Sequence, residues 1–387
     1  MSLYPSPWSL DRLLGLRYRV TSGHEVARVC QPRESCFIVG EEPPITIRAK
    51  GRYCVYVLVK KGKPTLQAIS VLEKKLLGRR HGRAVFFGLK DTDATTLQYV
   101  CAPCQPGSSQ GREGPIRLGE GAWARLVGYT DHCRSTPPEG NRFWIILEPL
   151  REVDDVLARL AELGSKLLPN YYGYQRFGTR RPNTHLLGLS LIKRDYATYL
   201  GELLGSPYPD ESTDNQLCRL RAWRGCESGL YESMLSARAE SVNDFVTKLP
   251  YKIVSLYVSA LQAYIFNLYL SKRIELGYRL SERIKGERGN STPLAPVPGL
   301  GYRIGVSGEA RQILRDVLES IGLSEEDIRR PVPRIKRVKP FWRPIAFRID
   351  SIRAKKIGDR VVVFFRLGYG MYATTVLREL VKIPDGL

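Results

Sequence analysis

The chain has 387 residues, 43% of them hydrophobic, which is enough to build the core of a globular protein with one or two domains. Its 60 lysines and arginines outnumber 39 acidic residues, and the formal net charge of +21 favours a polyanionic partner, nucleic acid first. Residues 1–15 lack the apolar stretch of a signal peptide, and no apolar run approaches the ~18 residues of a bilayer span. We therefore expect a cytoplasmic protein without a membrane partner, although a basic proteome alone could produce this charge.

The first half of the chain predicts a strand, a helix and a second strand in succession. Residues 53–61 alternate and are rich in β-branched side chains, as in a strand. Helical spacing follows from residue 65, with Thr65 as the expected cap and Gly78 as the expected end. The apolar stretch 84–89 reads as the second strand and delivers Asp91 just beyond its end.

Further elements follow in the second half. Residues 140–150 predict a strand, 152–164 an amphipathic helix, and 252–277 a helix that is apolar all round and therefore buried. The proline-spaced basic run 329–344 predicts an extended segment. Residues 360–382 read as a strand, a glycine turn and a helix.

Asp91 is the first candidate for chemistry. A carboxylate at the end of an apolar strand suits a nucleophile or base. The stretch Lys90-Asp91-Thr92-Asp93 is equally typical of a turn, in which an aspartate bonds the backbone two residues on. A metal site would need further oxygen ligands, which no nearby residue clearly supplies. On this stretch alone, the turn is favoured.

Two basic segments suit RNA. The loop 169–183 interleaves four aromatic residues with Arg176, Arg180 and Arg181, a combination that fits unstacked bases and phosphates. A loop packed on the core with solvated arginines explains the same composition. The run 329–343 is more specific for polyanions, although it also fits an ordinary solvated surface.

The eight cysteines do not show the two tight ligand pairs of a structural zinc site. Cys101 and Cys104 form the one close pair, and Cys218 and Cys226 are more widely spaced. We expect no metal, and either buried thiols or a Cys101–Cys104 disulfide.

Several motifs together resemble the TruD family of pseudouridine synthases, in an archaeal-type member. From about residue 33 to residue 382, they occur in the family's order as "CFIVGEE", "FFGLKDTDATTLQ", "GNRFWIIL", "PNYYGYQRFG", "SALQAYIFNLYLSKRI" and "GYGMYATTVLREL". The chain departs from the family near its start, where "QPRESCF" offers no clear counterpart of the usual lysine.

The resemblance implies an α+β fold with a catalytic domain whose mainly antiparallel sheet is flanked by helices, plus an inserted α/β domain that is specific to the family. The catalytic domain would comprise residues 1–177 and 336–387, and the insertion residues 178–335. The implied activity is that of an isomerase, which converts uridine to pseudouridine in tRNA without a cofactor. Uridine 13 of the D arm is the first choice of target, and uridine 35 of tyrosine tRNA the second.

The resemblance also assigns site residues. Asp91 matches the essential aspartate, as nucleophile at ribose carbon 1′, base at carbon 2′, or nucleophile at uracil carbon 6. The expected substrate-binding residues are Phe37, Asn141, Phe143, Phe177 and Tyr372. The expected supports for RNA or for the active site are Lys90, Arg176 and Arg378.

Two other functions remain open on the sequence. A tRNA-binding protein or RNA chaperone without catalysis would share the basic surface, and a carboxylate enzyme could act on another polyanion or glycan. The combination of Lys90, Asp91 and Asn141 favours the enzyme over the binder. We expect a monomer with tRNA as its partner and no obligate protein partner.

Overall fold

The computed structural model describes residues 3–43, 45–78, 84–88, 90–104, 114–134, 138–178, 181–205, 246 and 248–382. The chain divides into two compact units. Unit 1 comprises Met1–Ser22 and Leu167–Phe347, and unit 2 comprises Gly23–Lys166 and Arg348–Leu387. Among the residues singled out above, Arg180, Cys218 and Cys226 lie outside the described parts of the chain.

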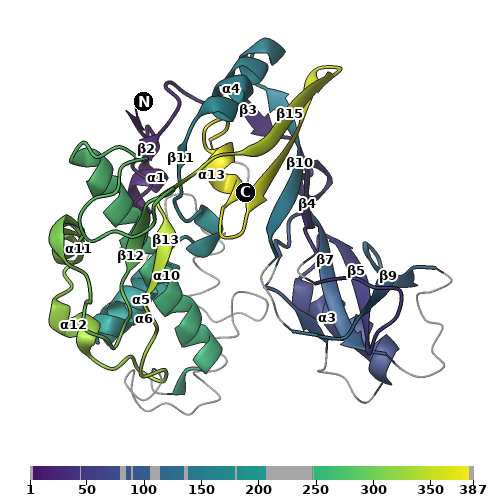
Figure 1. Cartoon of the computed structure of the whole chain (residues 1–387), viewed down its shortest axis with the longest axis horizontal. Helices are drawn as coiled ribbons and strands as arrows, with labels where there is room; N and C mark the ends of the chain where they lie inside the picture. Colours follow the sequence, from purple (N-terminus) through teal and green to yellow (C-terminus); the bar gives the residue numbers. More distant parts are fainter. Residues whose placement is uncertain are drawn as a thin grey trace. The chain divides into compact units, whose positions relative to one another are not determined.

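Unit 2 is built on one sheet of ten strands (Figure 1). In chain order the strands are β3 (Ala27–Val29), β4 (Phe37–Glu41), β5 (Tyr53–Lys61), β6 (Val85–Phe86), β7 (Thr95–Pro103), β8 (Ile116–Arg117), β9 (Ala122–Thr130), β10 (Gly140–Pro149), β15 (Asp350–Ile357) and β16 (Arg360–Gly368). The helices are α2 (Arg33–Cys36), α3 (Thr65–Leu77), α4 (Val153–Ser165) and α13 (Ala373–Leu377). The central order is β16-β10-β4-β7-β5, and of these neighbouring pairs only β4 with β7 is parallel. The predicted mainly antiparallel sheet with flanking helices is confirmed.

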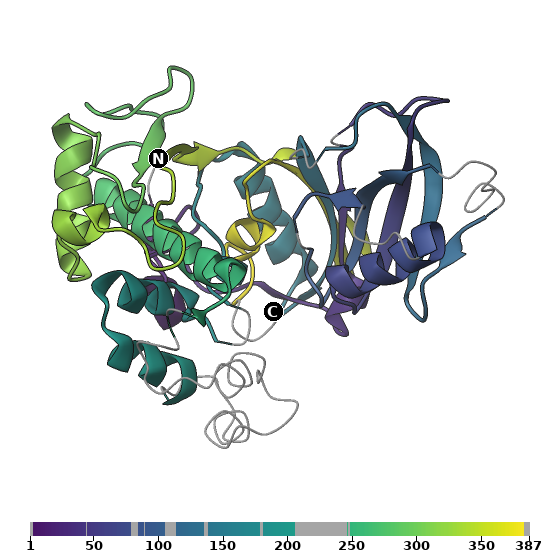
Figure 2. The same cartoon turned by 90° about the horizontal axis from the view of Figure 1, so that it is seen from below.

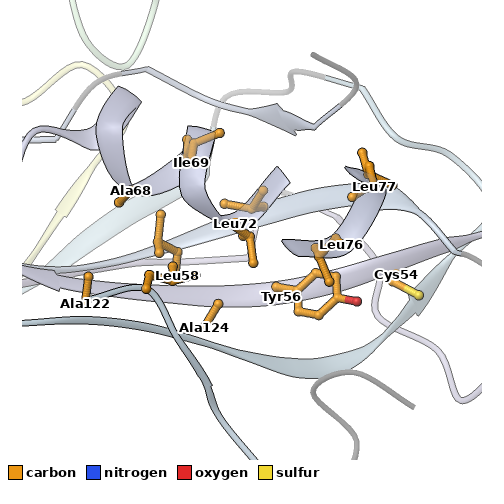
Figure 3. Packing of buried hydrophobic residues seen from close by; sticks show 13 residues of the cluster. Cys54, Tyr56, Leu58, Ala68, Ile69, Leu72, Leu76, Leu77, Ala122 and Ala124 are labelled. Atoms are coloured by element: carbon orange, nitrogen blue, oxygen red, sulfur yellow. The ribbon is translucent and has the colours of Figure 1, made fainter. Parts of the chain in front are cut away.

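Helix α3 covers one part of this sheet. Ile69, Leu72 and Leu76 on one side of the helix are buried against Tyr56 and Leu58 of β5 (Figure 3). This spacing of three and four residues is the period of a helix, while the strand contributes every second residue. The predicted strand 53–61 and the predicted helix from residue 65 are thereby confirmed, and Gly78 ends the helix with a positive φ of 56°.

Unit 1 is mainly helical with three pairs of short strands. Its strands are β1 (Tyr4–Pro5), β2 (Tyr18–Arg19), β11 (Leu168–Pro169), β12 (Leu294–Val297), β13 (Phe341–Pro344) and β14 (Ala346–Phe347). Its helical segments are α1 (Ser9–Leu13), η2 (Tyr174–Arg176), α5 (Thr184–Lys193), α6 (Tyr196–Leu200), η3 (Gly201–Gly205), α10 (Tyr251–Glu275), α11 (Gly308–Ser320) and α12 (Glu325–Arg329). The long helix α10, which is green in Figure 2, packs against α5 and α11.

Helix α10 corrects one expectation from the sequence. Its 25 residues contain an 18-residue window with a mean hydropathy of 1.5, so by length and composition it could cross a membrane. The reading that no apolar run approaches this length was therefore wrong. The helix is nevertheless the buried one that the sequence predicts, since 72% of that window is buried inside the protein, as in the core helix of a globular protein.

The compact units divide the chain differently from the expected domains. Residues 1–22, 167–177 and 336–347 were expected in the catalytic domain but belong to unit 1, where the first two segments contact α10. The amide of Asn267 donates to the carbonyls of Leu14 and Tyr172 (3.1 Å each), and the Ser271 hydroxyl donates to the carbonyl of Gly15 (2.7 Å). These buried hydrogen bonds explain why both segments belong to unit 1 by contact.

The cysteines pair differently from the expectation. Three disulfides lie in unit 2, namely Cys30–Cys36, Cys54–Cys104 and Cys101–Cys133. Both expectations were wrong for the described cysteines. They form disulfides instead of buried thiols, and Cys101 does not pair with Cys104 because Cys101 belongs to the extended strand β7. Residues three apart in a strand are separated by about 10 Å and point to opposite faces, beyond the reach of a disulfide.

Candidate active site

The register of the strands gathers the polar residues of unit 2 on one face of the sheet. Lys60 of β5 lies opposite Thr96 of β7, and Thr96 lies opposite Val39 of β4. Val39 in turn lies opposite Phe143 of β10. Because side chains alternate along a strand, Phe37 and Glu41 share this face with Val39, and Asn141 shares it with Phe143. Four strands that are distant in sequence therefore build one wall.

Asp91 lies in the loop between β6 and β7, and its carboxylate contacts both Asp93 and Arg33. Oδ1 accepts a hydrogen bond from the backbone N–H of Asp93 (3.1 Å), and Oδ2 lies 3.0 Å from Nη1 of Arg33. The first contact is the turn that the sequence predicts. The Arg33 and Asp91 side chains are only 6% and 12% exposed, so water screens this ion pair less than a surface pair. The same loop thus forms the predicted turn and holds the Asp91 carboxylate against Arg33.

Arg33 was not predicted as a site residue. It lies within "QPRESCF", where the family's usual lysine has no clear counterpart, and α2 presents its guanidinium to Asp91. The guanidinium also lies 4.7 Å from the centre of the Phe37 ring. The Cys30–Cys36 disulfide closes the short segment that carries Arg33. The signal in the sequence was an arginine two residues beyond the position where a lysine was sought.

The backbone of the loop is held by two further residues that sequence reasoning missed. Lys60, only 1% exposed, donates from Nζ to the carbonyl of Asp91 (2.5 Å). The hydroxyl of Thr65 accepts from the Lys90 N–H (3.1 Å) and lies 3.2 Å from the Lys90 carbonyl. Thr65 was expected to cap α3, but Pro64 occupies the cap position and the Thr65 hydroxyl binds the loop instead. For Lys60, the sequence did contain a signal. Lys60 follows the buried residues Tyr56 and Leu58 at every second position, which places it on the same face of the strand.

Burial changes the acid–base properties of Lys60. Desolvation lowers the pKa of its ammonium group from 10.5 to about 8, against the opposing effect of the Asp91 and Asp93 charges. The nearby Lys90 charge adds to the decrease. Around neutral pH, Lys60 is therefore still mainly a cation beneath the carboxylate loop.

Lys90 connects the loop to the wall of the site. Its Nζ lies 3.0 Å from Oδ1 of Asn141 and 3.2 Å from Oε1 of Glu41. The Glu41 side chain is fully buried, and burial raises the pKa of its carboxyl despite the neighbouring Lys90 charge. Lys90 thus orients the carbonyl end of the Asn141 amide.

The aromatic residues predicted in unit 2 form the apolar part of the wall. The Phe37 and Phe143 rings meet edge to face with centroids 6.2 Å apart, and Phe143 stacks on Phe365 at 5.2 Å. Phe37 and Phe143 are 3% and 6% exposed. The structure therefore brings Asp91, Lys90, Phe37, Asn141 and Phe143 together in unit 2, and their roles stay predictions.

The other predicted residues lie elsewhere. Phe177 and Arg176 belong to unit 1, where Phe177 is fully buried with its ring centroid 5.2 Å from that of His185. Tyr372 directly precedes α13 in unit 2. Arg378 is 1% exposed, with Nη1 3.9 Å from the Glu379 carboxylate, so its charge faces an internal partner. The roles of these four residues stay predictions.

Comparison with known proteins places the chain in a class and then in a family. A family model described as "tRNA pseudouridine synthase D (TruD)" matches residues 13–289 and 285–380. A Pyrobaculum islandicum protein is 30% identical over 96% of both chains, and a Methanopyrus kandleri protein is 31% identical over 86% of both. Both carry the name "Probable tRNA pseudouridine synthase D".

The fold agrees with a solved structure. A crystal structure from Methanosarcina mazei, whose description names tRNA pseudouridine synthase D, superposes with a TM-score of 0.72 at 22% identity. The match covers 97% of this chain and 98% of the other. The chain is therefore of the pseudouridine synthase class, which comprises isomerases. It belongs to the TruD family of tRNA pseudouridine synthases.

Proposed function

We propose that this protein converts a uridine of tRNA to pseudouridine, with Asp91 as the catalytic carboxylate. The observation that carries the proposal is the carboxylate itself, which is nearly buried, paired with Arg33 and fixed through its backbone by Lys60. Such a group costs no reorganisation when the substrate arrives, which is what a catalytic carboxylate needs.

The reaction breaks the bond between uracil N1 and ribose carbon 1′ and joins carbon 5 to carbon 1′. N1 gains a proton, and carbon 5 loses one. Asp91 acts at ribose carbon 1′, at carbon 2′ or at uracil carbon 6, and Arg33 orients its carboxylate in each case. The Asn141 amide reads the uracil edge, since an amide can both donate and accept.

The target uridine has to leave its helix to reach Asp91. Phe37 and Phe143 supply the apolar wall of the pocket in unit 2, and Tyr372 of the same unit is proposed to contact the substrate as well. Phe177 is proposed as a substrate-binding residue, and Arg176 and Arg378 as supports for RNA or for the active site. Uridine 13 of the D arm is the proposed target, with uridine 35 of tyrosine tRNA as the second choice. We further propose that the protein works in the cytoplasm, and that residues 178–335 form the family's insertion domain.

The test is tritium release from tRNA transcripts labelled at uracil carbon 5. The wild type should release tritium, whereas Asp91→Ala and Asp91→Asn should lose at least about a hundredfold in rate. Asp91→Asn should keep the affinity for tRNA, because the side chain keeps its size. Turnover by Asp91→Asn would overturn the role of Asp91. Tight binding of tRNA without release by the wild type would identify a binding protein or chaperone instead.

A further inference from the structure

An exposed aromatic pair lies at the margin of the site in unit 2. The rings of Phe87 and Tyr369 meet edge to face with centroids 5.7 Å apart. Phe87 is half-buried and precedes Lys90 by three residues, whereas Tyr369 directly follows β16 and is 57% exposed. Two loops that are distant in sequence thus present one aromatic surface beside the catalytic loop.

Tyr369 of this pair lies on the same face of the sheet as Asn141. Leu367 of β16 lies opposite Asn141, and Tyr369 continues the same alternation two residues later. The backbone N–H of Tyr369 donates to the carbonyl of Glu139 (3.0 Å), which extends the β10–β16 ladder past the ends of both strands. The Tyr369 side chain therefore lies beyond Asn141 along the sheet, on the face where Lys90 contacts Asn141.

Both rings are held by the backbone that carries them. The side-chain amide of Gln98 donates to the carbonyls of Phe87 (2.7 Å) and Gly88 (3.0 Å). Gly88 and Gly370 have positive φ angles of 66° and 79°, so the chain turns away directly after each ring. A large aromatic surface that is held in place yet exposed is typical of a binding site.

We propose that Phe87 and Tyr369 form a stacking platform for an unpaired RNA base next to the target uridine. The inference rests on the proposed function, because extracting a uridine leaves its neighbours without a stacking partner. An aromatic ring can replace that partner for any base, since every base presents a π-face. The net charge of +21 and the position beside Lys90 favour RNA over a protein partner.

The test compares three variants with the wild type in pseudouridine formation on tRNA. Tyr369→Leu should raise KM and the Kd for tRNA about tenfold, equivalent to about 1.4 kcal/mol, and leave kcat nearly unchanged. Tyr369→Phe keeps the ring and should stay within about twofold of the wild type. The matched control is Trp144→Leu, because Trp144 is 37% exposed, contacts the Phe364 ring at 5.2 Å and lies on the opposite face of the sheet from Phe143.

The outcomes separate this inference from the proposed function. An inactive wild type would overturn the function itself. An active wild type with an unchanged KM in Tyr369→Leu would overturn only the platform, as would an equal loss in Trp144→Leu. Binding of tRNA that is indifferent to Tyr369→Leu would leave a protein partner as the explanation of the exposed ring.

A second measurement distinguishes stacking from a structural role of Tyr369. Transcripts that lack the base on either side of the modified uridine should bind the wild type about tenfold more weakly at one of the two positions. Tyr369→Leu should lose nothing further with that transcript, because the interaction is already absent. Additive losses at both positions would contradict the platform.

Discussion

Two buried arginines, one in each unit, show how differently the chain uses the same side chain. In unit 1, Arg273 is fully buried, and its Nε donates to the Glu287 carboxylate at 2.9 Å. Its Nη1 donates to the carbonyl of Arg279 (2.8 Å), and its Nη2 to that of Glu282. In unit 2, Arg33 uses Nη1 for Asp91 and Asp93. Within the described part of the chain, its Nε and Nη2 are buried without hydrogen-bond partners.

The difference is that expected between a structural ion pair and one that serves the proposed reaction. All the N–H groups of a buried guanidinium need partners for stability, and Arg273 largely meets that demand. Unpartnered buried donors cost about 1–3 kcal/mol each and are typical of sites that serve chemistry. We therefore expect changes around Arg273 to lower stability and changes around Arg33 to lower turnover.

The largest expected effect concerns the ion pair of unit 1. Glu287→Gln leaves the buried Arg273 without a compensating charge and should lower the free energy of unfolding of unit 1 by about 3–5 kcal/mol. Urea denaturation measures the loss, and kcat of the folded enzyme should not change. Glu325→Gln is the control, because its pair with Arg311 is exposed and should contribute less than about 1 kcal/mol. A fall in kcat without a loss of stability in Glu287→Gln would show that the Arg273–Glu287 pair serves turnover instead.

The next effect concerns Arg33. Arg33→Met removes the ion pair that orients Asp91 and should lower kcat about a hundredfold, because small displacements of a reacting group have effects of that size. Arg33→Lys keeps the positive charge, and its kcat should lie between those of the wild type and Arg33→Met. Arg28→Met is the control, since Arg28 forms an exposed pair with Glu148 in the same unit. If Arg33→Met unfolded unit 2 as readily as Glu287→Gln unfolds unit 1, the distinction between the two arginines would fail.

The third effect is a pH dependence of stability from Lys60. Its pKa is about 8 in the folded protein and near 10.5 when unfolded, so between these pH values the unfolded chain binds more protons. The free energy of unfolding should therefore rise through this window, by at most about 1.4 kcal/mol per pH unit. Urea titrations at several pH values should show the rise in the wild type relative to Lys60→Met. Lys61→Met, whose Nζ binds the exposed Ser35 hydroxyl, should retain it.

The smallest effect concerns Thr65. Thr65→Val removes the hydroxyl that binds the Lys90 backbone and should lower kcat about fivefold, which corresponds to about 1 kcal/mol. Thr65→Ser keeps the hydroxyl and should retain most of the rate. Stability should change little because the Thr65 side chain does not cap α3. Steady-state kinetics on tRNA would reveal a purely structural role if kcat stayed unchanged in Thr65→Val.

Local pattern predicted those elements whose periodicity is strong. The strand 53–61 has the predicted bounds, and α3, α4, α10 and β16 lie where their periods place them. Strand β7 was not among the predicted elements, and Thr95 and Thr96 begin it directly after the predicted turn at residues 90–93. Thr95 and Thr96 are therefore explained by the sheet rather than by the site.

The sequence by itself determined the basic charge, the main helices and strands, the family motifs and the position of Asp91 in a turn. Only the tertiary structure decided which groups surround Asp91 and its loop. Arg33 and Lys60 contact Asp91, and Thr65 contacts Lys90, through pairings that join distant segments. The disulfides depended on the same pairings, since Cys54 and Cys104 come together only when β5 lies beside β7. Periodicity reports the local backbone, whereas the environment of a carboxylate depends on register, which is a property of the whole sheet.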